Sequence, residues 1–349
     1  MSERHAGGRR LPRRALRIAF ALGALFLAVH LLLPQVAGLE ATAEALSHAT
    51  WWLPALALAL EAGSFWSYGE LELVVLRDSG AWASRGLIQR TTIVGSSLGK
   101  TLPGGNTAAT AVVIGALHRQ GLPAAPTTSA LAASGIVSWA VLALLLPVGA
   151  ILALVAGRTG ALALGAAGAA AAILALAALL PLALRRPERI GELVAAAVRR
   201  LAVGPVRRWV DPEATAAFVV SGIESANTFA HDRRALLRAG GWAAANWLLD
   251  VAVLAVLAAT IGSGTPLLPL LLAYVIGQLL AAVPITPGGV GLVEPAMIGA
   301  LVASGAPFAA ATATVLGWRL VSHWLPIAAG LLLLPTVLRR ARPLTHPAA

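Results

Sequence analysis

The sequence predicts an all-α polytopic membrane protein, and three observations support this fold class. Its 349 residues are 58% hydrophobic and only 12% charged, whereas soluble domains carry about 25% charged residues. Several apolar runs exceed the ~20 residues that a helix needs to cross the hydrocarbon core of a bilayer. Two further apolar stretches are each interrupted by Pro-Gly-Gly, which a regular helix does not accommodate.

The uninterrupted apolar runs are predicted to be six full membrane spans. They cover about residues 15–37, 50–76, 127–156, 160–184, 239–262 and 308–335. The interrupted stretches, 86–118 and 267–304, are predicted to be re-entrant helical hairpins with Pro-Gly-Gly at each tip. Counting these two as membrane segments gives eight spans in all.

The basic residues indicate the orientation of the spans. Most of the 26 lysine and arginine residues would lie on one side of the membrane if each span crosses once. Because cytoplasmic loops are enriched in basic residues, we expect both termini in the cytoplasm and the protein in the inner (plasma) membrane. The net charge of +11 is then a topology signal, so nucleic acid is not an expected partner.

The two halves of the chain resemble each other. When the sequence is shifted by 184 positions, Pro103-Gly104-Gly105 falls on Pro287-Gly288-Gly289, and Ile114–Leu117 falls on Ile298–Leu301. The hairpins would enter from opposite sides of the membrane under the predicted orientation. The sequence therefore predicts an inverted-topology repeat, which is a common plan of secondary transporters.

The chain is predicted to form a single integral membrane domain. It covers residues 1–338 and ends in a short cytoplasmic tail at 339–349. The first repeat covers about 50–156 and the second about 239–335, and a basic cytoplasmic segment at 185–238 separates them.

The hairpin tips supply the candidate substrate site. Irregular backbone at membrane depth is tolerated only where it is buried in protein or lines a polar cavity, so the two tips are expected to meet around one cavity. The helix that follows each tip begins with unpaired N–H groups, which suit an anionic headgroup. The candidate substrate-binding residues are Lys100, Pro103, Gly104, Gly105, Asn106, Pro287, Gly288, Gly289, Glu294 and Arg319.

Ionisable side chains at mid-membrane are functional candidates because their burial is costly. Further candidates for charge balance or proton coupling are Glu61, Asp250 and His323. An alternative interpretation is that charges pair as struts between helices, for example Arg319 with Glu294 or Asp250. Glu70 and Glu72 lie near a helix end and are expected to reach the interface, and most of the ten tryptophans are expected to be interface anchors.

The sequence shows no motif of a known catalytic or cofactor site. It has no cysteine, no His-Glu-x-x-His, no Gly-x-Ser-x-Gly and no phosphate-binding Gly-rich loop that ends in Lys-Ser/Thr. We therefore expect neither an enzyme nor a cofactor or metal site, although an intramembrane enzyme that relies on a few carboxylates stays an alternative.

The second half of the chain contains motifs that resemble those of one known family. Pro287-Gly-Gly-Val-Gly-Leu-Val-Glu294, then Gly317-Trp-Arg319 and Trp324-Leu-Pro326, resembles the signature of the lysylphosphatidylglycerol synthase/flippase transmembrane-domain family. Leu98-Gly-Lys-Thr-Leu-Pro-Gly-Gly105 resembles its first-half motif. The resemblance covers roughly residues 15–338, and no soluble synthase domain is expected in this chain.

The resemblance implies a function in lipid transport. In the best-known members of the family this domain flips an aminoacylated phospholipid between leaflets, and Glu294 and Arg319 match charged positions of the family motif. After the first tip, relatives commonly carry an acidic residue and an arginine, where this chain has Asn106-Thr-Ala-Ala-Thr110. The headgroup that this chain handles is therefore not fixed by the resemblance.

We expect a flippase-like transporter of a lipid with a polar, phosphate-bearing headgroup. Its partner would be a membrane phospholipid or a polyprenyl-linked lipid. Two alternatives stay open: a secondary transporter of a small solute, and a non-transporting membrane subunit of an envelope-lipid or glycolipid pathway. Self-association and association with an envelope-lipid enzyme are both compatible with the sequence.

Overall fold

The computed structural model describes residues 52–102, 105–155, 186–201, 211–229, 232–282 and 287–339, with a few single residues between 165 and 171. These residues form helices joined by short connections, and no strand occurs among them. The predicted span 15–37 and all but those few residues of 160–184 lie outside the described residues, as do Pro103, Gly104 and the tail beyond Arg339.

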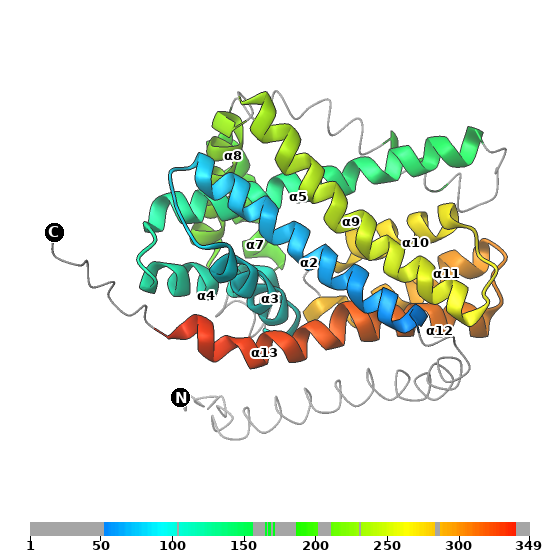
Figure 1. The fold of residues 1–349 in the computed structure, drawn as a ribbon. Helices are drawn as coiled ribbons and strands as arrows, with labels where there is room; N and C mark the ends of the chain where they lie inside the picture. The colour runs from blue at the N-terminus through cyan, green and yellow to red at the C-terminus, as the bar shows by residue number, and fades with distance from the viewer. Residues whose placement is uncertain are drawn as a thin grey trace, which may run out of the picture.

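Four long helical segments coincide with four of the predicted spans (Figure 1). Three are long and apolar enough to cross a membrane. The other, α2, has 27 residues but carries four carboxylates, which makes it less apolar. The segments are α2 (Trp52–Asp78), α5 (Ala124–Val155), α9 (Arg233–Ile261), and α12 (Phe308–Arg319) continuing through η3 (Leu320–Trp324) into α13 (Leu325–Leu338).

Each interrupted stretch forms two short helices with the break at Pro-Gly-Gly. The first pair is α3 (Arg85–Thr101) and α4 (Gly105–Arg119); the second is α10 (Leu267–Ala281) and α11 (Val293–Ala303), with a short 3-10 turn, η2 (Pro287–Gly289), between them. Gly105, Gly288 and Gly289 have φ angles of 55°, 61° and 67°, in the left-handed region that glycine adopts readily. The predicted breaks are therefore confirmed, whereas the side from which each pair enters the membrane stays a prediction.

The helices of the two halves make reciprocal contacts. The central pair is α2 and α9, while α3 and α4 lie to one side of it and α10 and α11 to the other (Figure 1). The short helix α3 of the first half packs on α13 of the second, and α10 of the second half packs on α5 of the first. This exchange is expected of two structurally related halves, and it supports the predicted repeat without fixing the orientation of either half in the membrane.

Small residues allow close approach where α3 crosses α13. A Cβ added to Gly330 would lie 2.8 Å from the carbonyl oxygen of Ile93, and the Ser97 hydroxyl donates to the Ile327 carbonyl oxygen at 3.0 Å. Small residues and interhelical hydrogen bonds are typical of helix packing in membranes. This contact places the end of α3, and with it Lys100, beside the segment Leu320–Trp324.

The basic segment between the halves forms two helices, α7 (Pro187–Leu201) and α8 (Pro212–Phe229). α7 packs on α8, and α8 packs on α5. An exposed ion pair joins Arg199 to Glu213 at 2.6 Å. The segment therefore packs on the helical assembly through α8, and the single membrane domain stays a prediction.

Candidate functional site

Arg319, the last residue of α12, connects four groups at the second helix break. Its Nε lies 2.8 Å from Glu294 Oε1, off the axis of a hydrogen bond, so the contact is an ion pair. Its terminal nitrogens donate to the carbonyl oxygens of Gly288 at 3.3 Å and Gly289 at 3.4 Å, and one contacts His323 Nδ1 at 3.1 Å. The predicted strut between Arg319 and Glu294 is thus present, and the same guanidinium holds the Pro-Gly-Gly turn.

Glu294 also completes the start of its own helix. It lies in the first turn of α11, and its second oxygen accepts a hydrogen bond from the Gly291 N–H at 2.7 Å. The first N–H groups of a helix have no intrahelical partner, and a carboxylate is favourable there. The carboxylate of Glu294 therefore lies at the start of α11 and binds the backbone of the turn just before it.

The contact with Arg319 defines the protonation state of the His323 ring. A guanidinium can only donate, so His323 Nδ1 must accept, and the ring is neutral with its proton on Nε2. Only 3% of His323 is exposed. His323 is therefore a buried neutral partner of Arg319 rather than a second cation.

The segment Leu320–Trp324 is a π-helix inside an otherwise α-helical span. π-Bulges frequently occur at functional sites. Pro326 follows in α13, and because proline has no N–H, the Ser322 carbonyl oxygen lacks its α-helical donor four residues on. Lys100 from α3 supplies the missing donor, since its Nζ donates to Ser322 O at 2.7 Å.

The Ser322 side chain joins two carboxylates from different helices. Its Oγ lies 2.9 Å from Glu61 Oε2 on α2 and 2.7 Å from Asp250 Oδ1 on α9. Asp250 accepts two further hydrogen bonds, from the Tyr274 hydroxyl at 2.8 Å and from Trp318 Nε1 at 2.7 Å. Both carboxylates therefore meet on one hydroxyl, beside an aromatic wall in which the rings of Tyr274 and Trp318 pack edge to face.

The two helix breaks adjoin each other at this cluster. α3 packs against η2, and a Cβ added to Gly288 would lie 3.3 Å from the carbonyl oxygen of Lys100. The Lys100 ammonium lies 5.5 Å from the centre of the Phe65 ring, within the range of a cation–π contact. Lys100 and Arg319 thus approach the same place from the two breaks.

Most of the sequence-predicted site residues lie in or beside this cluster. Gly105 lies at the start of α4, where an added Cβ would be 3.6 Å from Gly99 O. Asn106 is exposed, and Pro103 and Gly104 lie outside the described residues. Pro287 begins η2. Those that the structure brings together are Glu61, Lys100, Asp250, Gly288, Gly289, Glu294, Arg319 and His323.

Three residues of the cluster were not predicted from the sequence, namely Tyr274, Trp318 and Ser322. Tyr274 and Trp318 are buried aromatic residues whose polar atoms face Asp250. One signal for Ser322 was present, because a proline four residues after a serine frees that serine's carbonyl oxygen inside a span. The partners of its hydroxyl come from α2 and α9, far away in sequence.

Glu70 and three of the tryptophans are placed differently from what the sequence led us to expect. Glu70 is not exposed but buried, with a forked contact to Arg85 at 2.6 and 3.1 Å. Trp318 is 3% exposed, and Trp139 and Trp247 pack against the core in a chain of aromatic contacts. These tryptophans have polar or aromatic partners inside the bundle, so they are not interface anchors.

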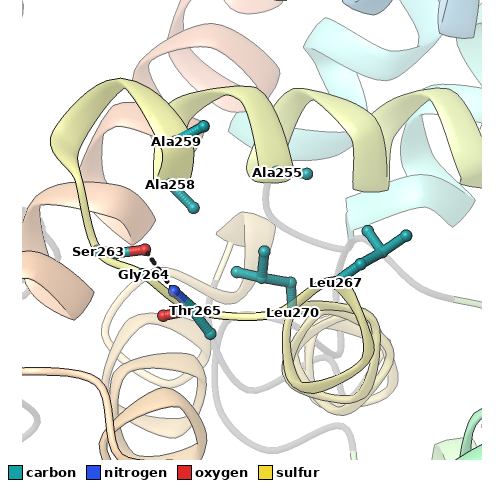
Figure 2. Close-up of a pocket in the computed structure, with 8 residues that line it drawn as sticks. All are labelled: Ala255, Ala258, Ala259, Ser263, Gly264, Thr265, Leu267 and Leu270. Atoms are coloured by element: carbon teal, nitrogen blue, oxygen red, sulfur yellow. Dashed lines mark hydrogen bonds between the residues drawn. The ribbon is translucent and has the colours of Figure 1, made fainter.

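A small cavity of about 230 Å³ lies elsewhere, at the turn between α9 and α10 (Figure 2). The Thr265 N–H donates to the Ser263 hydroxyl across this turn at 3.3 Å. The charged cluster contributes no residue to it. Its lining residues are Ala255, Ala258, Ala259, Ser263, Gly264, Thr265, Leu267 and Leu270.

The apolar spans and the charge cluster at two broken helices define a multi-pass α-helical membrane protein with a buried polar site. Over residues 14–330 the chain matches the family described as the lysylphosphatidylglycerol synthase TM region. The chain therefore belongs to this family, which confirms the resemblance found from the sequence. A search of curated proteins found no match.

Proposed function

We propose that this protein is a flippase-like transporter that moves a lipid with a phosphate-bearing headgroup between membrane leaflets. The observation that carries the proposal is the approach of two cations, Lys100 and Arg319, to one place where two helix breaks adjoin. Such charges are costly at membrane depth and typically mark substrate or ion pathways. Membership of the family supports the same function.

The two cations would have different tasks. Arg319 is already engaged with Glu294 and with two carbonyl oxygens of the turn, so it reaches a phosphate only if Glu294 gives way. Lys100 has three N–H groups, and one of them donates to Ser322 O. Lys100 would therefore contact the phosphate first. Arg319 would then bind the phosphate in place of the carboxylate of Glu294.

The membrane arrangement belongs to the proposal as well. Both termini would lie in the cytoplasm, and the protein would reside in the inner membrane, as the basic residues indicate. The reciprocal contacts of α3 with α13 and of α10 with α5 suit two halves that rock against each other around a fixed site. The tails of the lipid would stay in the bilayer while its headgroup passes the breaks.

The test uses purified protein in liposomes that contain fluorescent phosphatidylglycerol, with an impermeant quencher added outside. We expect the wild-type protein to expose the inner-leaflet lipid to the quencher, Lys100→Met to lose this activity, and Arg119→Met, at an exposed helix end, to retain it. Uptake of soluble glycerophosphate without lipid movement would instead favour a small-solute transporter. Neither activity, together with stable co-purification of an envelope-lipid enzyme, would favour a non-transporting subunit.

A further inference from the structure

The contact of two carboxylates with one hydroxyl constrains where protons lie in the cluster. Glu61 Oε2 and Asp250 Oδ1 are both within hydrogen-bonding distance of Ser322 Oγ, at 2.9 and 2.7 Å. A serine hydroxyl has one hydrogen to donate. It can point to one carboxylate only, so the other contact needs a hydrogen on the second carboxyl group.

The other donors around the pair show which carboxyl group carries that hydrogen. Asp250 accepts from the Tyr274 hydroxyl on one oxygen and from Trp318 Nε1 on the other, and hydrogen bonds to a carboxylate favour its ionised form. In the described part of the chain, the side-chain partners of Glu61 are the Ser322 hydroxyl and the carboxyl group of Asp250 itself. Asp250 is thus the ionised acceptor, and Glu61 is the carboxyl group that carries the hydrogen, between Ser322 Oγ and Asp250.

The balance of charge leads to the same assignment. The described cluster contains three carboxyl groups and two basic groups, the guanidinium of Arg319 and the ammonium of Lys100. Arg319 neutralises Glu294 at 2.8 Å, which leaves Lys100 to face both Glu61 and Asp250. One proton on the pair makes the cluster neutral, and neutrality is strongly favoured in a low-dielectric interior.

We propose that Glu61 binds an exchangeable proton that moves together with the anionic headgroup. The coupled movement rests on the proposed function, whereas the proton site itself does not. When a phosphate binds beside Lys100, it adds negative charge next to the carboxylate pair and so favours the proton on Glu61. By reciprocity the bound proton favours the phosphate, so lipid and proton travel in the same direction.

The other groups around Glu61 do not compete with it for this proton. Lys100 comes from α3 and Asp250 from α9, and Ser322 and His323 come from η3, next to Arg319 at the end of α12. The helix α5, which also packs on α2, has no titratable residue. His323 accepts from Arg319 and would become a second cation beside the guanidinium if protonated, so it does not compete for the proton.

The test compares the Glu61→Gln and Glu70→Gln variants in liposomes with fluorescent phosphatidylglycerol and a pH gradient. Glu70 is a buried carboxylate on the same helix, about 14 Å further along at ~1.5 Å per residue, and is paired with Arg85. We expect a gradient acidic on the side of origin to speed lipid movement about 5-fold or more, near the low end of typical coupling. Glu70→Gln should keep this response, and Glu61→Gln, which mimics the protonated group, should lose it.

Infrared spectroscopy of the protonated carboxyl group tests the proton site without relying on lipid transport. Purified wild-type protein and Glu70→Gln should both show the C=O stretch of a protonated carboxyl group that diminishes on alkaline titration, and Glu61→Gln should lack this component. If lipid does not move but the band behaves in this way, the proposed function fails and the proton site stands. A band that persists in Glu61→Gln, lipid movement that ignores the pH gradient, or a response to a sodium gradient instead would overturn the proposal.

Discussion

The two helix breaks differ in how they are held. At the break between α10 and α11, Arg319 contacts Glu294 and the carbonyl oxygens of Gly288 and Gly289. At the break between α3 and α4, the nearby cation is Lys100, which reaches away from its own break to Ser322 in the other half. Asn106, at the start of α4, is exposed.

From this difference we expect the two related breaks to have different tasks, the second as an anchor and the first as a moving part. The second break is held by a buried ion pair with several hydrogen bonds, which resists separation because each charge would be left unpaired. At the first break the cation is Lys100, whose side chain is flexible and is held by one hydrogen bond to the Ser322 carbonyl oxygen. We therefore expect the second break to be the stable reference and the first to supply the cation that follows the substrate.

Removing the anchor should have the largest effect. Arg319→Ala leaves Glu294 buried without its cation, and breaking such a pair typically costs about 3–5 kcal/mol. Thermal unfolding in detergent, followed through the fluorescence of the ten tryptophans, measures the loss. The double variant Arg319→Ala with Glu294→Gln should recover part of the lost stability. If the single and the double variant were equally stable, the ion pair would not be the anchor.

The glycines of the two breaks offer the next comparison. Gly105→Ala and Gly288→Ala each place a side chain at a positive φ, which costs ~1–2 kcal/mol. At Gly288 the new Cβ would also clash with the His323 ring and lie 3.3 Å from Lys100 O, which adds about 1–3 kcal/mol of overpacking. The same unfolding assay should rank Gly288→Ala as the less stable variant, and the opposite order would refute the tighter packing of the second break.

Replacing the cation of the first break should affect transport more than stability. Lys100→Met removes one hydrogen bond to Ser322 O and also the burial of a charge, so we expect a net stability change of about 1 kcal/mol. Movement of fluorescent phosphatidylglycerol should nevertheless be lost. A variant that unfolds as readily as Arg319→Ala would show that Lys100 is an anchor too.

The smallest effect is expected at Asn106. Its side chain is exposed in this conformation, and surface substitutions of this kind usually change stability by less than about 0.5 kcal/mol. Asn106→Ala should therefore unfold like the wild type. A large loss of stability would mean that the first break is held as firmly as the second.

Local chemistry explains which parts of the fold could be predicted from the sequence. Pro-Gly-Gly breaks a helix wherever it occurs, so both breaks were correctly placed. Arg319 and Glu294 stand out because charges are rare in such apolar sequence, and their pairing follows from the cost of burial. Glu70 was misplaced, because its partner Arg85 lies on the next helix and nothing local to α2 reveals it.

The arrangement around Ser322 could not be predicted in the same way. Its partners Glu61, Lys100 and Asp250 lie on three other helices, and the packing of those helices decides which polar atoms meet. The π-helical segment that presents Ser322 has only one local signal, the following Pro326. Trp318 resembles an interface anchor in sequence, and its role becomes visible only through its hydrogen bond to Asp250.

Side-specific thiol labelling tests most directly whether the two breaks meet at one site that is reached from opposite sides. The chain has no cysteine, so single cysteines at Asn106 and Val290, with the exposed Ala214 of α8 as the control, can be labelled by an impermeant reagent from each side. We predict that Asn106→Cys is labelled from the cytoplasm and Val290→Cys from outside, and that added phosphatidylglycerol protects both but not Ala214→Cys. Labelling of both breaks from the same side, or labelling that the lipid leaves unchanged, would contradict the account.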